Sequence, residues 1–314
     1  MSLLLAFTGV SPDSWVKAIN EADPSLEVVI AGDPGVDLSS VRHALVWKPQ
    51  AGLLKSLPHL ETVFSIGAGV DYLMDDPTLP DVTVVRVVDA DLTARMTEWV
   101  VLQVLLQHRR QRLYDAQQRQ RLWRAHSQVA ARDVRVGIMG VGVLGQDAAR
   151  ALTMLGFDVA GWSRTPKTIE GLATYDGDAG LDAFLARTDI LVVLLPLTDE
   201  TRGILNAALF AKLAKDGPLG GAVLINAGRG GLQVEADIIP ALERGDLIAA
   251  SLDVFQTEPL PETSPLWDDE RIVITPHVAA ESDPRAIARY VAGQIRAAAR
   301  GEPLKNVVDR RRGY

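Results

Sequence analysis

Short runs of hydrophobic residues alternate along the chain with longer segments in which hydrophobic residues recur every three or four positions. The short runs predict buried strands and the longer segments predict helices, because these spacings match the two backbone periodicities. Regular alternation of strands with helices is typical of α/β domains with parallel sheets. We expect one series of strands at 3–7, 27–31, 44–47, 62–66 and 82–88, and a second at 134–139, 157–162, 190–195, 222–226, 247–252 and 271–275.

The longest helical pattern runs from about Thr93 to Trp123. Its first half, 99–106, is hydrophobic on almost every side and is therefore expected to be buried. Its second half, 108–124, is rich in arginine. This composition indicates either an anion or nucleic-acid patch, or a helix that faces solvent or another subunit.

The two strand series predict an α/β fold with two Rossmann- or flavodoxin-like domains, each built on a parallel sheet, with a cleft between them. A chain of 314 residues fits about two domains. The first is expected to comprise 1–98 and, through a C-terminal return of the chain, 284–314. The second, 99–283, is expected to be the nucleotide-binding domain.

Charge and cysteine content narrow the function. The 32 basic and 40 acidic residues give a net charge of −8, which argues against nucleic acid or membrane partners and favours the solvent- or subunit-facing interpretation of 108–124. The absence of cysteine excludes disulfides, thiolate metal sites and a cysteine nucleophile, and no metal is expected. No run approaches the roughly 18 apolar residues of a membrane helix, and no signal peptide is recognisable, so we expect a cytoplasmic protein.

A glycine-rich turn follows the expected strand 134–139 and precedes a helical pattern. Its six residues match GxGxxG: Gly140, Val141, Gly142, Val143, Leu144 and Gly145. The first glycine allows a tight turn, the second lets the backbone approach a pyrophosphate, and the third lets the helix pack on the strand. The helix N-terminus then offers N–H groups to the phosphates. We therefore predict a dinucleotide site, with a structural turn or a methyltransferase as the alternatives.

The next expected strand, 157–162, ends in Ser163 and Arg164, with Lys167 close behind. An NAD site usually has an acidic residue here to bind the ribose hydroxyls. Arg164 can instead pair bidentately with a 2′-phosphate, while Ser163 offers a hydroxyl donor and Lys167 a second charge. We therefore predict that NADP(H) is preferred and that NAD(H) is a second cofactor. The alternative is a surface arginine in a turn.

Three residues with catalytic chemistry follow three separate expected strands: Arg229, Glu258 and His277. The carboxyl ends of parallel strands line the ligand crevice of an open sheet, so these side chains are expected to converge. Arginine matches the geometry of a carboxylate, histidine exchanges a proton near neutral pH, and a carboxylate orients the imidazole. The set suits reduction of an anionic 2-oxo acid by a hydride carrier. Taken singly, each has an ordinary structural explanation.

Five motifs carry a resemblance to a known family: GVGVLG at 140–145, INAGRGG at 225–231, LDVFQTEPLP at 252–261, SPLW at 264–267 and TPHVAA at 275–280. The chain resembles the D-isomer-specific 2-hydroxyacid dehydrogenases, particularly the short glyoxylate/hydroxypyruvate reductases. The resemblance implies that Arg229 binds the substrate's carboxylate and carbonyl groups. It also implies that His277 is the acid/base and Glu258 its partner. The cofactor positions that it implies are Leu195, Pro196, Asn226, Ala227 and Asp253.

The N-terminal half contains the residues that are expected to bind the substrate. The segment 65–71 resembles the family's substrate loop, in which Gly67, Ala68 and Gly69 would expose backbone N–H groups to a carboxylate. An ordinary glycine-rich turn is the alternative. Trp47 lies at an earlier strand end, where the resemblance implies that it lines the substrate pocket; otherwise it belongs to the core.

The resemblance therefore implies an enzyme that uses NADPH to reduce a small 2-oxo acid, glyoxylate or hydroxypyruvate, and that forms a homodimer through its cofactor domains. Two alternatives stay open: a non-enzymatic dinucleotide-sensing or corepressor protein, and a dehydrogenase for a bulkier 2-oxo acid. Pro240 departs from the expected pattern because it falls inside the helical segment 234–244, where proline removes a backbone donor.

Overall fold

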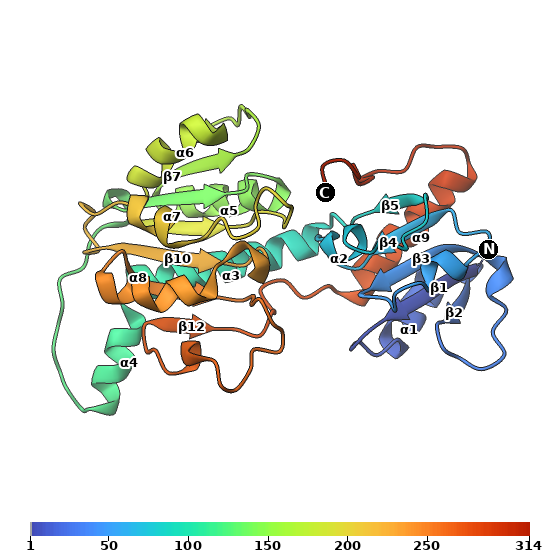
Figure 1. The fold of residues 1–314 in the computed structure, drawn as a ribbon, viewed down its shortest axis with the longest axis horizontal. Coiled ribbons are helices and arrows are strands. Elements are labelled where there is room, and N and C mark those ends of the chain that lie inside the picture. The colour runs from blue at the N-terminus through green and yellow to red at the C-terminus, as the bar shows by residue number, and fades with distance from the viewer. Residues whose placement is uncertain (1) are drawn as a thin grey trace. The chain divides into compact units, whose positions relative to one another are not determined.

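The structure, a computed structural model, describes residues 2–314. The chain divides into two compact units: one extends to Leu92 and includes Glu281–Tyr314, and the other is Thr93–Ala280. The expected crossings, after residues 98 and 283, therefore differ from these limits by a few residues. Both units are α/β with parallel sheets, which confirms the expected fold class (Figure 1).

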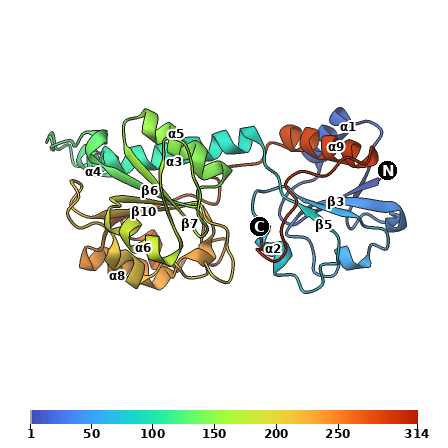
Figure 2. The same cartoon turned by 90° about the horizontal axis from the view of Figure 1, so that it is seen from above.

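The first unit is built on a five-stranded parallel sheet with the order β2-β1-β3-β4-β5. Its helices are α1 (Asp13–Ala22), the short α2 (Asp71–Met74) and α9 (Pro284–Ala299), and α9 packs beside α1 (Figure 2). The strands are β1 (Ser2–Phe7), β2 (Glu27–Ile30), β3 (Val41–Trp47), β4 (Thr62–Ser65) and β5 (Thr83–Val85).

The central strand β1 is buried on both faces, as its continuous hydrophobic run predicts. Leu3 and Leu5 lie in the cluster that includes α1 and α9, whereas Leu4 and Ala6 lie in the cluster on the opposite face. The return of the chain in α9 therefore completes the core of the first unit.

The second unit is built on a seven-stranded parallel sheet with the order β12-β11-β10-β9-β6-β7-β8. The order reverses beside β6, as in doubly wound dinucleotide-binding folds. The strands are β6 (Arg135–Met139), β7 (Asp158–Ser163), β8 (Ala173–Asp176), β9 (Ile190–Val193), β10 (Ala222–Asn226), β11 (Leu247–Leu252) and β12 (Ile272–Ile274).

Helices cover both faces of this sheet (Figure 2). One face carries most of α3 (Ala90–His108) and α5 (Val143–Met154). The other carries α6 (Gly177–Ala186), α7 (Ala207–Lys212) and α8 (Ile238–Arg244). Burial on both sides explains why the strands of the second series read as nearly continuous hydrophobic runs.

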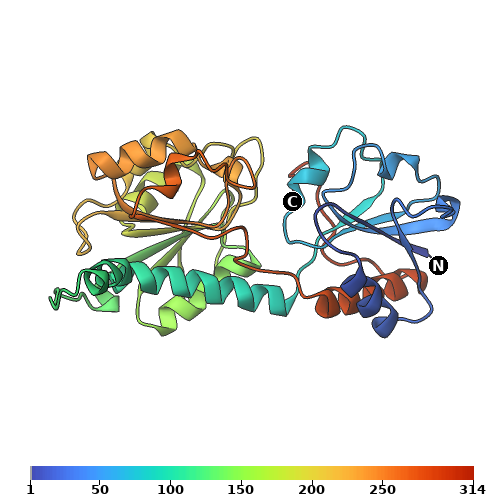
Figure 3. The same ribbon diagram turned by 90° about the horizontal axis from the view of Figure 1, so that it is seen from below.

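The expected single helix over 93–123 is wrong. Helix α3 ends at His108, and a separate helix α4 covers Gln111–Arg119, because Arg110 adopts a left-handed conformation with φ 53°. The left-handed residue interrupts the hydrogen-bond ladder. Burial of 99–106 is also incomplete, since Leu102 is 52% exposed. Figure 3 shows α3, in teal, along one face of its sheet. Over the described residues 2–314, no helix combines the length and the hydrophobicity required for a membrane span.

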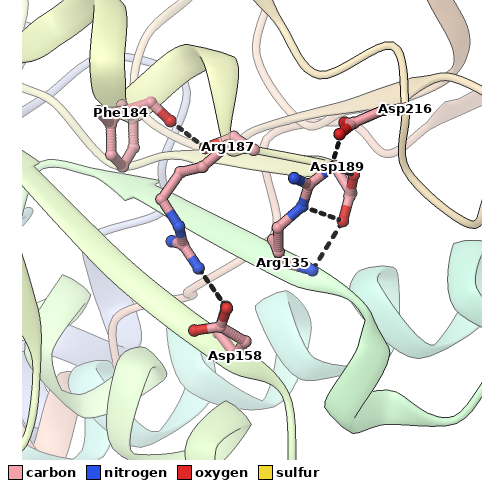
Figure 4. Close-up of polar contacts among 7 residues, drawn as sticks. Arg135, Asp158, Phe184, Arg187, Asp189 and Asp216 are labelled. Carbon is pink, nitrogen blue, oxygen red and sulfur yellow. Dashed lines mark hydrogen bonds and ion pairs between the residues drawn. The ribbon is translucent and has the colours of Figure 1, made fainter.

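Charged residues clamp the amino ends of the central strands in the second unit (Figure 4). Arg135, which begins β6, donates to the buried Asp189 from Nε at 3.0 Å and from Nη2 at 2.8 Å, and its Nη2 also reaches Asp216 at 2.8 Å. These hydrogen bonds raise the pKa of Arg135 and lower that of Asp216. Nearby, Arg187 pairs with Asp158 at 2.7 Å. The clamp therefore lies at the end of the sheet opposite the carboxyl ends of the strands.

Candidate active site

The glycine loop lies at the carboxyl end of β6, between that strand and α5. Gly140 has φ +102°, and a methyl group added there would lie 2.7 Å from the Leu194 carbonyl oxygen. A methyl group on Gly145 would overlap the carbonyl oxygen of Gly140, whereas one on Gly142 would meet nothing within 4 Å. The loop thus has a tight turn, a close strand–helix contact and an open stretch of backbone beside a helix N-terminus. This geometry fits a pyrophosphate.

The basic residues after β7 have different neighbours. Arg164 Nη1 lies 3.3 Å from Oε2 of Glu200. Lys167 Nζ donates to the Val141 carbonyl at 3.2 Å, which ties this segment to the glycine loop. The Ser163 hydroxyl, expected as a ligand donor, donates to the Thr165 carbonyl at 2.8 Å. Arg164 and Lys167 are therefore the groups that fit a 2′-phosphate best.

His277 and Glu258 form the contact that the sequence suggests. His277 Nδ1 lies 2.9 Å from Glu258 Oε2. The two residues follow the neighbouring strands β12 and β11, so the parallel register carries both to one edge of the sheet. Since Nδ1 faces the carboxylate, Nε2 is the ring nitrogen left for proton exchange with a substrate. The backbone of His277 is left-handed, with φ 56°, an uncommon conformation for a residue other than glycine.

Asp253 holds the loop that carries His277. Its buried carboxylate accepts hydrogen bonds from the hydroxyl of Thr275 at 2.5 Å, the amide of Val278 at 3.0 Å and the amide of Ala279 at 2.9 Å. The carbonyl of Asp253 also accepts from the amide of His277 at 2.8 Å. The Asp253 carboxylate, expected at the cofactor, is thus bound within the chain, where it fixes the left-handed turn.

Arg229 follows β10, the strand beside β11, and its Nη1 donates to the Gly228 carbonyl at 2.8 Å. Asn226 is fully buried and braces this turn. Its Nδ2 donates to the Arg229 carbonyl at 3.2 Å and to Gln233 at 2.9 Å, and its Oδ1 accepts from the Gly228 amide at 3.0 Å. Asn226, expected at the cofactor, is therefore bonded within the chain, where it braces the turn that carries Arg229.

The remaining expected cofactor residues lie at the same edge. Leu195 and Pro196 follow β9, and the Pro196 carbonyl accepts from the hydroxyl of Thr201 at 2.8 Å. Ala227 follows β10 and is nearly buried, with its amide bound to the Val193 carbonyl at 3.2 Å. Arg229, Glu258 and His277 thus lie at the carboxyl ends of the parallel strands, where the glycine loop also lies.

In the first unit, the expected substrate residues lie together at the carboxyl ends of β3 and β4. A methyl group on Gly67 would lie 2.9 Å from the ring of Trp47, so glycine permits this close approach. Trp47 is half-buried and meets Tyr72 edge-on at 5.3 Å between ring centroids. The Gly67 amide donates to the Ser65 hydroxyl at 3.2 Å, which leaves the amides of Ala68 and Gly69 as the anion donors to test.

Sequence reasoning missed three groups: Glu200 beside Arg164, the bracing role of Asn226, and the loop-fixing role of Asp253. Of these three residues, only Glu200 is absent from the expected set, and its place in the loop after β9 is the one signal in the sequence. Among residues 2–314, no cluster of three or more potential metal-ligating side chains is found.

Comparison with known proteins places the chain among relatives of one family. Residues 101–279 match the family described as D-isomer specific 2-hydroxyacid dehydrogenase, NAD binding domain. The chain is 39% identical over 320 residues to glyoxylate/hydroxypyruvate reductase A of Serratia proteamaculans (strain 568), with 100% of each sequence covered.

Two solved structures are similar over the whole chain. The NADPH-dependent glyoxylate/hydroxypyruvate reductase from Sinorhizobium meliloti, in complex with NADP and sulfate, is 52% identical, with a TM-score of 0.96. A D-isomer specific 2-hydroxyacid dehydrogenase from Xanthobacter autotrophicus Py2, in complex with NADPH and MES, is 42% identical, with a TM-score of 0.94. Each comparison covers 100% of this chain and 99% of the other.

The family match spans more than half of the chain and includes the glycine loop, Arg229, Glu258 and His277. The full-length relative and the two structures extend the similarity to the first unit. These findings confirm the resemblance drawn from the five motifs and the expectation of an oxidoreductase. The chain is a member of the D-isomer-specific 2-hydroxyacid dehydrogenase family.

Proposed function

We propose that this enzyme reduces glyoxylate or hydroxypyruvate to the corresponding 2-hydroxy acid with NADPH. The observation that carries the proposal is the 2.9 Å contact between His277 and Glu258, at the sheet edge that also holds the glycine loop and Arg229. The named activities of the Serratia and Sinorhizobium relatives support the same substrate class.

The proposed chemistry assigns each side chain a separate task. Arg229 binds the substrate carboxylate, for which its planar guanidinium provides paired donors. His277 donates a proton from Nε2 to the carbonyl oxygen as that oxygen becomes a hydroxyl, and Glu258 holds the charged ring in place. When bound, the reduced nicotinamide supplies the hydride for the carbonyl carbon. Asp253 and Asn226 keep His277 and Arg229 in the required positions.

The test is His277→Gln, followed by the loss of NADPH absorbance with glyoxylate. We expect kcat to fall about 10²–10⁴-fold, the usual effect of removing a general acid. His59→Gln, at an exposed position of the first unit, is the control and keeps normal turnover. Near-normal turnover of His277→Gln would refute the assignment of the proton donor.

We propose that the residues expected for substrate binding in the first unit restrict substrate size. The amides of Ala68 and Gly69 would bind the carboxylate, and the Trp47 ring, packed against Gly67 and Tyr72, would form a rigid wall. Trp47→Ala is expected to shift kcat/KM from glyoxylate toward a bulkier 2-oxo acid by about tenfold or more. An unchanged ratio of kcat/KM between the two substrates would show that Trp47 has a purely structural role.

For the cofactor, we propose that Arg164 and Lys167 bind the 2′-phosphate of NADP(H), so that NAD(H) binds more weakly. The β7 end lacks the acidic residue that NAD sites usually carry, and the Sinorhizobium and Xanthobacter structures contain NADP or NADPH.

We also propose that the protein forms a homodimer through α3 and the arm formed by α4 and residues 120–126. The arm exposes Trp123 fully and Leu122 by 49%, and Leu102 on α3 is 52% exposed. Residues 108–124 contain six arginines and one aspartate, whereas the whole chain has net charge −8. A basic arm with hydrophobic side chains therefore complements the acidic remainder of a second copy.

A cytoplasmic location belongs to the same proposal. It is supported by the lack of cysteine, since the fold needs no oxidising compartment. Recovery of the enzyme in another cell fraction would contradict it.

A further inference from the structure

We propose that Glu200 is a specificity-determining residue for the cofactor. Its carboxylate would accept a hydrogen bond from the ribose hydroxyls of NAD(H) and repel the 2′-phosphate of NADP(H), so that it limits the preference created by Arg164. The inference rests on the proposed cofactor site at Arg164.

The topology of the second unit brings the two side chains to the same point. Strand β6, which carries the glycine loop, lies between β7 and β9. Arg164 follows β7 and Glu200 lies in the loop after β9, so they belong to the two loops that flank the glycine loop. Arg164 Nη1 and Glu200 Oε2 are 3.3 Å apart. A carboxylate is therefore present beside the β7 end, although it comes from a different strand.

Lys167 fixes the segment that carries Arg164 relative to the glycine loop. Its Nζ bonds to the Val141 carbonyl inside the glycine loop, and it lies three residues after Arg164. The segment that presents Arg164 is thus anchored to the loop expected to hold the pyrophosphate. A ribose attached to that pyrophosphate would reach the Arg164–Glu200 pair.

The Glu200 carboxylate is charged and held in place. Thr198 and the Glu200 backbone amide bond to it, and together with Arg164 they keep its pKa below the ordinary value. The Thr198 amide in turn donates to the hydroxyl of Thr201 at 2.8 Å, which makes the loop a compact turn. Because the Glu200 side chain is 64% exposed, a ligand can reach it.

This charge acts in opposite directions on the two cofactors. A phosphomonoester carries about −1.5 to −2 charges near neutral pH, so a neighbouring carboxylate raises the cost of binding it. A ribose hydroxyl instead donates a hydrogen bond to a carboxylate, which is the role of the acidic residue in NAD sites. Arg164 favours the phosphate and Glu200 favours the hydroxyl, and the balance between them sets the preference.

The test measures the dissociation constants of NADP⁺ and NAD⁺ by calorimetry on the full chain. These two ligands differ only in the 2′-phosphate. We expect Glu200→Gln to tighten NADP⁺ about two- to fivefold and to weaken NAD⁺ by a similar factor, the range of exposed charge interactions. Asp199→Asn, which removes the same charge one residue earlier in the loop, is the control and changes the ratio far less.

Unchanged constants in Glu200→Gln, a parallel shift for both ligands, or an equal shift in Asp199→Asn would overturn the inference. A thermal melt of each variant shows that the fold is intact, since an exposed ion pair contributes little to stability. The ratio of the NAD⁺ and NADP⁺ dissociation constants of the wild type tests the role of Arg164 separately. A wild type that binds NAD⁺ as tightly as NADP⁺ contradicts the proposed phosphate site, whereas the shift caused by Glu200→Gln still decides the role of Glu200.

Discussion

Asp253 fixes the segment that carries His277. Its two carboxylate oxygens accept three hydrogen bonds from the segment around His277, and its carbonyl accepts a fourth from the His277 amide. A residue in a left-handed backbone conformation persists only when its surroundings impose that conformation. The hydrogen bonds of Asp253 therefore help to keep His277 oriented toward Glu258.

We expect Asp253→Asn to lower kcat about 10²-fold, because the amide group would face backbone N–H donors and displace the loop by a fraction of an ångström. Affinity for glyoxylate should change less, since Arg229 is held independently by Asn226. Steady-state kinetics separates the two effects. Asp268→Asn, at an exposed position of the second unit, is the control, and a loss confined to KM would contradict the positioning role.

The sequence predicts that Glu258 and His277 converge because each lies in the loop that follows a hydrophobic strand. The carboxyl ends of adjacent parallel strands lie side by side, so strand order alone brings these two loops together. It does not predict the contact between Arg164 and Glu200, or the bracing by Asn226. These depend on the path of each loop and on rotamers, which hydrophobic periodicity does not encode.

Among the elements, the strands with continuous hydrophobic runs are predicted well and the polar ones are not. β8 (Ala173–Asp176) was missed because it lies at the sheet edge and has no fully buried residue. Pro240 proves compatible with α8 because it lies in the first turn, where its missing N–H needs no helical partner. The break at Arg110 was missed because no glycine or proline interrupts the helical pattern there.

The charge clamp at the amino ends of β6 and β9 yields a stability prediction. Arg135→Met leaves the carboxylate of Asp189, only 1% exposed, without its guanidinium partner. We expect the free energy of unfolding to fall by about 3 kcal/mol, as when one partner of a buried ion pair is removed. Urea denaturation measures the change.

The matched control for this prediction is Lys212→Met, which breaks the exposed pair between Lys212 and Asp182. It should change the unfolding free energy by less than about 1 kcal/mol. Equal effects of the two variants would show that Asp189 does not depend on Arg135.

At the scale of the whole molecule, the arm predicts the oligomeric state. Its return segment is held to α4 by the His126 amide, which donates to the Tyr114 hydroxyl at 3.3 Å, and by Gln117, whose side chain meets the His126 ring at 3.0 Å. The arm is therefore an ordered projection that leaves Trp123 and Leu122 exposed. Such exposed hydrophobic groups on an ordered element mark an interaction surface.

Light scattering should give about twice the chain mass of 33.9 kDa for the wild type. Trp123→Glu combined with Leu122→Asp should shift the mass toward the monomer, because it places charge in the proposed interface. Met154→Glu, at another exposed hydrophobic position, is the control. A wild-type mass near that of a single chain would rule out the proposed homodimer.

The return of α9 to the first unit has a consequence for biosynthesis. Thr93–Ala280 is continuous in sequence, so the second unit can fold without any residue that follows it. The first unit lacks α9 until Glu281–Tyr314 emerge, which at about 5–20 residues per second takes some tens of seconds or less after β5. During that interval, the face of β1 formed by Leu3 and Leu5 lacks part of its cover. The segment made first is therefore completed last, and nascent chains expose an apolar sheet face that chaperones can bind.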